Sequence, residues 1–283
     1  MHMANTDMSL MKTLSVLAAI SAFALAAAAH AQFDHLHASW GVLLKRHVVP
    51  VDGGKASQLR YVGMAADRAE LKSYLSSLSG VSETEFRGWS KDQQLAFLIN
   101  AYNAHMIELV LTRHPNIKSV WDFGKLFNNP FKNRFFTLFG KAFSLDNIEH
   151  DMIRANGVYN DPRIHFAVNC ASVGCPMLRD EPYTASKLEQ QLEDQTTRFL
   201  SDRSRNRYNS VTRMLEVSKI FSSPPWYGGD FSRGWKGYRS RESFFAKYAY
   251  LLADQPDEQK VVRELQAGIR HLDYDWDLND TKR

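Results

Sequence analysis

Apolar residues recur at helical spacing over long stretches of the chain. The spacing predicts helices over residues 33–45, 67–78 and 91–114, and the third has the broadest apolar stripe before Pro115 ends it. Later helices are predicted over residues 183–200, 242–252 and 258–271. Helical segments therefore occupy much of the chain.

The period of the pattern changes in the middle of the chain. Residues 134–145 predict a hairpin with its turn at Gly140-Lys141. Apolar and polar residues alternate over 164–169, which predicts a strand that ends at the first cysteine, and residues 211–221 predict another strand. Because helices outnumber strands and the two are interspersed, we expect an α+β fold. It would be a helix-rich single domain packed on a small mixed or antiparallel sheet.

The first 31 residues have the order of a secretory signal peptide. Lys12 supplies a positive charge, residues 14–28 are almost wholly apolar, and residues 29–31 read Ala-His-Ala, with small residues where signal peptidase reads them. The alternative is an uncleaved anchor, but the apolar run is about fifteen residues and a membrane-spanning helix needs about 20. We expect cleavage after Ala31, no later membrane span, a periplasmic or secreted protein, and one globular domain over residues 32–283.

The composition excludes several classes of protein. The chain is 44% hydrophobic and 23% charged, which supplies a core and excludes a disordered or low-complexity chain. Thirty-five basic against 31 acidic residues leave a net charge of +4, a small surplus that argues against a nucleic-acid partner. Two cysteines exclude a disulfide-stapled scaffold and a four-cysteine zinc site. No cofactor is expected.

The least ordinary segment is HFAVNCASVGCP, residues 165–176, which holds both cysteines. A loop leaving a strand end is a rigid base for a reactive group, and the small residues leave room for backbone N–H groups to converge on an oxyanion. Three interpretations stay open: a disulfide between Cys170 and Cys175, a nucleophilic Cys170 activated by an imidazole, and a metal site with Cys and His ligands. The spacing supports the metal site least, because neither Cys-x-x-Cys nor His-Glu-x-x-His occurs.

His150 is the most suggestive partner for the thiol. It lies on a short predicted helix just beyond the hairpin, and the adjacent Glu149 could orient its ring. His165 is closer to Cys170 in sequence, but in a regular strand it would face the opposite side.

Two pairs of residues are further candidates. Asn100 and Asn103 lie at i and i+3 on one face of the third helix, where buried asparagines need hydrogen bonds. They either tie the helix to a loop or orient His150 and a substrate. Trp226 and Tyr227 follow two prolines on a loop, and either pin that loop to the core or line a groove for sugars or peptides.

Several sequence blocks resemble the family named domain of unknown function 547. They are FLINAYNAHMIELV, SLDNIEHDMIR, DPRIHFAVNCASVGCPMLRDEPYTASKLEQQL and a final SKIF, WY and DF, and they cover about residues 90–235. The resemblance implies a domain found alone in bacterial secreted proteins and joined to other modules in eukaryotes. It also implies that the residues matching Glu149, His150 and Cys170 are steadier in the family than those matching His165 and Cys175, which favours the thiol over the disulfide.

The leading hypothesis is a cysteine-dependent hydrolase or acyltransferase that acts on amide or peptide-like bonds, with a peptide-like or cell-envelope ligand as its partner. Cys170 would attack, His150 would be the base, and Glu149 or Asn103 would orient the imidazole, while backbone N–H groups beyond Cys170 hold the oxyanion. The residues expected to contact substrate are Asn100, His165, Asn169, Ser172, Trp226 and Tyr227. A polar helix against a small sheet is compatible with a papain- or transglutaminase-like arrangement. The alternatives are a non-catalytic envelope binding or scaffolding module and a Cys/His metal-binding protein.

Overall fold

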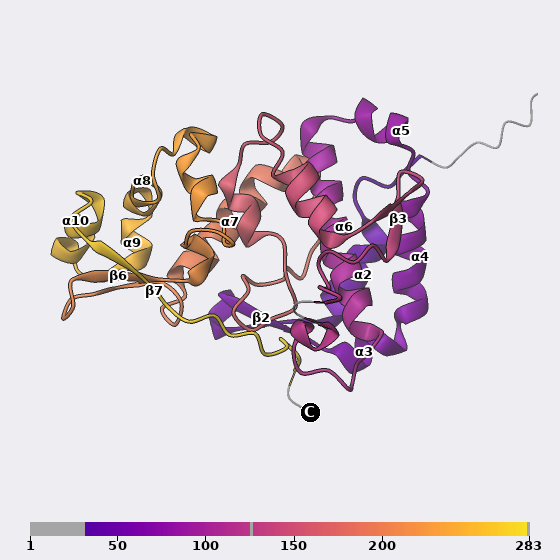
Figure 1. The fold of residues 1–283 in the computed structure, drawn as a ribbon, viewed down its shortest axis with the longest axis horizontal. Coiled ribbons are helices and arrows are strands. Elements are labelled where there is room, and N and C mark those ends of the chain that lie inside the picture. The colour runs from indigo at the N-terminus through magenta and orange to yellow at the C-terminus, as the bar shows by residue number, and fades with distance from the viewer. Residues whose placement is uncertain (1–31, 125–126, 282–283) are drawn as a thin grey trace, which may run out of the picture. The chain divides into compact units, whose positions relative to one another are not determined.

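The computed structural model describes residues 32–124 and 127–281 of the chain (Figure 1). From Asp34 onward the described residues form one compact unit. The predicted signal peptide, residues 1–31, lies outside the described residues. Within the described ranges, no helix combines the length and the apolar character that crossing a membrane requires.

The described residues combine helices with three small sheets. The α-helices are α2 (Ala38–His47), α3 (Tyr61–Ala66), α4 (Arg68–Ser79), α5 (Glu83–Gly88), α6 (Lys91–Leu111), α7 (Leu188–Ser201), α8 (Arg241–Lys247), α9 (Ala249–Leu252) and α10 (Pro256–Arg263). The antiparallel pairs are β1 (Val48–Val51) with β2 (Ala56–Leu59), β3 (Phe136–Leu138) with β4 (Lys141–Phe143), and β5 (Arg207–Asn209) with β6 (Met214–Val217). Strand β7 (Gly268–His271) adds to β6 in parallel. This arrangement confirms the α+β class.

Helix α6 is buried on almost every face, as its broad apolar stripe predicts. Its start is fixed by a capping box: Gln93 N–H donates to Ser90 Oγ at 3.2 Å, and Ser90 N–H donates to the Gln93 side chain at 2.9 Å. Helix α4 and the short helix η3 (Asn147–Ile153) both pack against α6. Helix α6 is therefore a fixed support for the residues that follow the hairpin.

The predicted hairpin is confirmed, and its turn lies one residue earlier than expected. Phe139 and Gly140 connect β3 to β4, with φ of 54° and 71°. Positive φ at both central residues is the conformation that matches the twist of a two-residue hairpin. Gly140 adopts it without the steric cost that a Cβ brings.

The strand predicted over residues 164–169 is wrong. Residues Pro162–Phe166 form a 3-10 helix, η4, which starts at Asp161, whose carboxylate accepts the Arg163 N–H at 3.0 Å. Pro162 at the first helical position suits such a start. The apolar and the polar residues of this segment are both buried, so their alternation does not mark one buried and one solvated face of a strand. The argument that His165 faces away from Cys170 in a strand therefore does not hold.

The C-terminal part also differs from the prediction. The helix expected over 258–271 stops at Arg263, because Leu265 has a φ of 60°, and the chain then forms β7. The strand expected over 211–221 is shorter and covers only Met214–Val217. The helix expected over 242–252 is divided into α8 and α9.

A cluster of buried aromatic rings fixes two loops that carry polar residues of interest. Phe166 packs on Phe199 of α7 at 5.2 Å between ring centroids, and Phe221 packs on Phe231 at 5.0 Å. Phe166 and Phe231 also contact each other, at 5.9 Å. Because these large rings leave little freedom, the residues next to them, His165 and Asp230, have defined positions.

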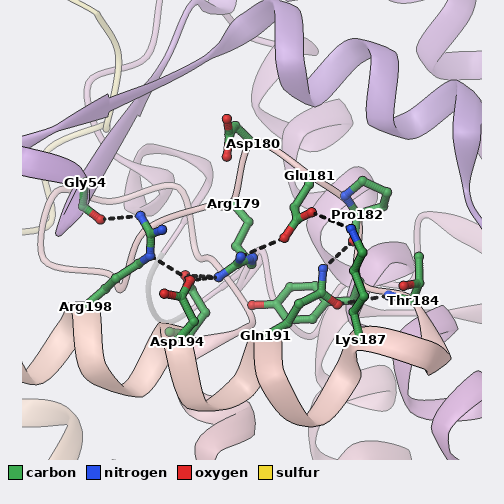
Figure 2. Close-up of polar contacts among 12 residues, drawn as sticks. Gly54, Arg179, Asp180, Glu181, Pro182, Thr184, Lys187, Gln191, Asp194 and Arg198 are labelled. Atoms are coloured by element: carbon green, nitrogen blue, oxygen red, sulfur yellow. Dashed lines mark hydrogen bonds and ion pairs between the residues drawn. The ribbon is translucent and has the colours of Figure 1, made fainter.

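Helix α7 holds the loop that follows the second cysteine, as Figure 2 shows. Arg179 forms ion pairs with Glu181 in the loop, at 2.7 Å, and with Asp194 of α7. Arg198 of α7 pairs with the same Asp194 at 2.7 Å and donates to the Gly54 carbonyl at 2.9 Å. These ion pairs and the hydrogen bond to Gly54 thus hold the segment between the cysteines and α7 in place.

Candidate active site

A cavity of about 470 Å³ lies where segments distant in sequence meet. Its aromatic lining residues are Tyr102, Trp121, Phe131, Trp226, Tyr227 and Trp276. The polar and charged ones are Asn129, Lys132, Asp146, Glu149, His150 and Cys170. A mostly apolar hollow with a few polar groups is typical of a small-molecule site.

The sulfur of Cys170 lies at the cavity wall among hydrogen-bonding groups. Its Sγ is 3.1 Å from the Ser172 hydroxyl, 3.1 Å from the Tyr274 hydroxyl and 2.7 Å from the Cys175 sulfur. The Cys170 N–H donates to the Cys175 sulfur at 2.9 Å. Both cysteines are free, so the structure does not contain the disulfide that one interpretation allowed, although the two sulfurs are neighbours.

These contacts separate the acidities of the two thiols. Burial raises the pKa of Cys170, but hydrogen bonds from Cys175, Ser172 and Tyr274 outweigh it, and the net pKa is below that of an ordinary cysteine. Burial and the neighbouring Cys170 sulfur raise the pKa of Cys175 well above its usual range. Cys170 is therefore the thiol that ionises first, and Cys175 is still protonated when Cys170 is a thiolate.

The backbone next to Cys170 has a strained conformation. Ala171 is buried and has a φ of 62°, in the left-handed region that residues with a Cβ avoid. Its N–H donates to the Asn169 side chain at 2.9 Å, and its carbonyl accepts the Asn279 N–H at 3.1 Å. Strain of this kind is found preferentially at functional sites.

Asn103 of α6 anchors the segment before Cys170. Its Nδ2 donates to the Ala167 carbonyl at 3.0 Å, and its Oδ1 accepts the Asn169 N–H at 2.8 Å. Asn100, one turn earlier, does the same for another loop, because it donates to the Tyr183 carbonyl at 2.7 Å and accepts the Tyr183 N–H at 3.0 Å. Both asparagines thus tie helix to loop, and neither lines the cavity.

The loop after Cys170 does not present free N–H groups to the cavity. The N–H groups of Val173, Gly174 and Cys175 donate to the carbonyls of Asp277, Asp275 and Ser172. That of Ser172 faces the Cys170 sulfur. The oxyanion hole expected from this loop is therefore not formed, because the C-terminal segment and the sulfur already accept these hydrogen bonds.

Glu149 and His150 reach the cavity from η3, a π-helical turn beyond the hairpin. His150 Nδ1 is hydrogen-bonded to a guanidinium nitrogen of Arg154, and its Nε2 lies 3.7 Å from a carboxylate oxygen of Asp146. Because a guanidinium only donates, Nδ1 is the acceptor and Nε2 carries the hydrogen. No hydrogen bond joins His150 to Cys170 among the described residues, although both line the cavity.

Arg154, Asp230 and His165 form a buried network behind the cavity. Arg154 donates to the two Asp230 oxygens at 2.6 and 3.1 Å, and His165 Nε2 lies 2.8 Å from the same carboxylate. Asp230 is fully buried, which raises its pKa, but His165 and Arg154 hold the net pKa well below the usual range. Burial lowers the pKa of His165, so its ring is neutral.

The site residues predicted from the sequence fall into two groups, those that line the cavity and those that do not. The lining of the cavity brings together Cys170, His150, Glu149, Trp226 and Tyr227. The remaining predicted residues, Asn103, Asn169, Ser172, His165 and Asn100, are not part of the lining. Ser172 touches the sulfur, Asn169 bridges the loop to the Pro176 carbonyl at 2.8 Å, and the His165 ring stacks on Tyr227 at 4.0 Å.

Residues 86–200 match the family model described as "Protein of unknown function, DUF547". Over these residues the chain is similar to the DUF547 family. The match confirms the resemblance of the sequence blocks over a somewhat shorter span than expected. No curated protein and no solved structure matches the chain.

The DUF547 region supplies only part of the cavity. It contains Cys170, Glu149 and His150, while the Trp226 loop and Trp276 lie beyond it. Within the described ranges, no group of three or more His, Cys, Asp or Glu side chains is arranged to hold a metal ion.

Sequence reasoning missed several residues of the site. Arg154 follows His150 by one helical turn, and that spacing was a usable signal. Asp230 lies in the loop that Trp226 and Tyr227 singled out in the sequence. Its hydrogen bonds with Arg154 and His165 could not be predicted from residue spacing. Tyr274 and Trp276 follow a strand that was predicted as helix, so nothing in the pattern linked them to Cys170.

Proposed function

We propose that the protein is a cysteine-dependent hydrolase or acyltransferase acting on amide or peptide-like bonds, with Cys170 as nucleophile. The observation that supports this most is the surroundings of one sulfur, which combine a cavity wall with a lowered thiol pKa. The thiolate is the reactive form of cysteine, so a lowered pKa provides more of it near neutral pH. The periplasmic or secreted location belongs to the same proposal and is supported by residues 1–31 alone.

In the proposed reaction the Cys170 thiolate adds to the carbonyl carbon and a C–S bond forms. The C–N bond then breaks, the nitrogen leaves with one added proton, and a thioester remains on Cys170. The Cys175 thiol, 2.7 Å from the Cys170 sulfur, is the nearest acid and supplies that proton. Attack by water then releases a carboxylic acid, or attack by an amine transfers the acyl group. In either case the attacking molecule returns one proton to Cys175, the C–S bond breaks, and the Cys170 thiolate is restored.

We assign His150 a different role from the base expected from sequence. With Nδ1 occupied by Arg154, the ring offers a hydrogen at Nε2 and no free lone pair. That hydrogen can be donated to the carbonyl oxygen, where negative charge develops. Lys132, exposed at the cavity wall, adds a positive charge for the same oxygen.

The first test is the alkylation rate of Cys170 as a function of pH, measured by peptide mass spectrometry on the reduced protein. We expect a midpoint below about 8.5, the value of an unperturbed cysteine. Cys175 in the same protein is the internal control and should stay unlabelled. Tyr274→Phe should raise the midpoint because it removes a donor to the sulfur, whereas Tyr250→Phe at an exposed position should not.

The same assay separates the two roles of His150. If His150 donates only to the substrate, His150→Gln and His150→Ala both leave the alkylation midpoint unchanged. A base would instead shift the midpoint in both variants. An unreactive Cys170, or a midpoint at the ordinary value, would remove the nucleophile and leave a non-catalytic binding module.

A further inference from the structure

We propose that the cavity recognises a primary ammonium group of its ligand, and that Glu149 binds it. This inference rests on the proposed function to the extent that both use the same cavity. It concerns Glu149 and not Cys170, however, and the binding of a cation and not a covalent reaction.

The main observation is a buried acid with an unsatisfied oxygen. Glu149 lines the cavity, its residue surface is only 4% exposed, and its Oε1 has no hydrogen-bond partner among the described residues. A buried carboxyl oxygen without a hydrogen-bond donor destabilises the folded protein, because the hydrogen bonds that it made to water are not replaced. Such a group needs a donor that the described residues do not supply, and a ligand in the cavity can supply it.

The second observation is a matching acceptor opposite Glu149. His165 donates its Nε2 hydrogen to Asp230, so Nδ1 carries a lone pair, and it too has no partner among the described residues. His165 Nδ1 and Glu149 Oε1 are 3.9 Å apart, too far for a hydrogen bond between them. His165 does not line the cavity, but a donor with more than one hydrogen at Glu149, such as an ammonium group, can satisfy both acceptors because they face each other.

The surroundings favour a cation over a neutral amide. Burial is the main cause of the raised pKa values of Tyr227 and Tyr102, and both hydroxyls are also close enough for the Glu149 charge to raise their pKa further. Both are lining residues, and aromatic faces attract ammonium groups. Arg154, a partly buried cation that the Glu149 charge also influences, is engaged by Asp230, with which it forms two hydrogen bonds. Glu149 therefore has no ion-pair partner of its own from a guanidinium among the described residues.

The ligand class that follows is an amide that also carries a primary amine. The amine would bind at Glu149, and the amide carbonyl would lie at Cys170 on the same cavity. An amino-acid amide or a peptide with a free amino group carries both groups, whereas an amino sugar carries the ammonium group alone. The experiment distinguishes these two sources.

The test is calorimetric binding to Cys170→Ala protein, which cannot react. Two matched pairs serve as probes: phenylalanine amide with its N-acetyl form, and glucosamine with N-acetylglucosamine. We expect the free amine of at least one pair to bind about 10- to 100-fold more tightly than its acetylated form, the range for a hydrogen bond to a charged group. The pair that shows the difference identifies the source.

Glu149→Gln in the same background should abolish the difference between amine and acetylated form. Asp151→Asn is the matched control, because it removes the same charge from an exposed position on η3 that does not line the cavity. Equal binding within both pairs, or no binding by any probe, would overturn the proposal, and neither result needs the Glu149 variant to fold. An unreactive Cys170 combined with selective amine binding would overturn the proposed function and leave this inference intact.

Discussion

Ala171, directly after the candidate nucleophile, holds a conformation that its side chain disfavours. The left-handed region costs a residue with a Cβ roughly 1–2 kcal/mol, and the hydrogen bonds with Asn169 and Asn279 keep Ala171 there. This turn directs the following Ser172 back toward the sulfur, where its hydroxyl is 3.1 Å from Sγ. The conformation of one residue thus contributes to the acidity of its neighbour.

Ala171→Gly should raise the free energy of unfolding by up to about 1 kcal/mol, because glycine adopts this φ without strain. The greater conformational freedom of glycine in the unfolded chain offsets only part of this stabilisation. Urea unfolding followed by fluorescence measures it. Ala167→Gly is the control, since Ala167 has a φ of −104° and glycine should only destabilise there. A loss of stability in both variants would contradict the strain at Ala171.

At the scale of elements, α6 acts as a support for two loops. Asn103 and Asn100 each make one donated and one accepted hydrogen bond to a loop backbone, but only the Asn103 loop leads into Cys170. The two asparagines are therefore a matched pair with equal bonding and different consequences for the site.

Asn103→Ala and Asn100→Ala should each destabilise the fold by about 2 kcal/mol, because each leaves buried backbone groups unpaired. Only Asn103→Ala should also move the alkylation midpoint of Cys170 up toward that of an ordinary cysteine, because the loop would lose its position beside Tyr274. Unfolding curves and the alkylation assay separate the two effects. If Asn100→Ala shifted the alkylation midpoint as much as Asn103→Ala, the midpoint would depend on overall stability and not on the position of the Cys170 loop.

The helices and strands differ in how well each could be predicted from its own sequence. Helix α6 was predictable because its apolar stripe, its Ser90 cap and Pro115 all agree. The segment 164–169 was not, because a burial pattern reports periodicity only when one face is polar and solvated, and here both His165 and Asn169 are buried. Strand β7 was missed because its pairing with β6 comes from a distant part of the chain.

At the scale of the whole molecule, buried histidines make the fold sensitive to acid. Burial lowers the pKa of His105, on α6, to about 3 and that of His37 to about 4. An unfolded histidine titrates near 6.5, so between these values the unfolded chain binds more protons than the folded one. Stability should therefore fall as the pH is lowered from about 6.5. Asp230, whose pKa is depressed, adds its loss only below about pH 3.9.

His105→Phe tests this at one position and keeps the ring that stacks on Phe136 at 3.7 Å. His105 alone should cost about 3 kcal/mol between pH 6.5 and pH 4, and the variant should lose that much less over this range. Urea unfolding at a series of pH values measures both proteins. Parallel curves for the two proteins would show that His105 does not set the acid limit.

The candidate site could be predicted only where its residues are close in sequence or chemically unusual. Cys170, His150 and Glu149 were found through short motifs, and Trp226 and Tyr227 through an aromatic loop. The partners that set their chemistry, Tyr274 for the thiol and Asp230 for the network, are brought in by tertiary packing, which no local spacing encodes.

The position of Tyr274 has a consequence for biosynthesis. This hydroxyl reaches the Cys170 sulfur across 104 positions of the chain, and Trp276 closes part of the same cavity. A ribosome releases Cys170 long before it releases either residue. Until residues 274–276 have been made and packed, the sulfur would lack the Tyr274 donor and the cavity would lack the part of its wall that Trp276 supplies. A product that terminates before Tyr274 would therefore carry a less acidic Cys170 and an incomplete cavity.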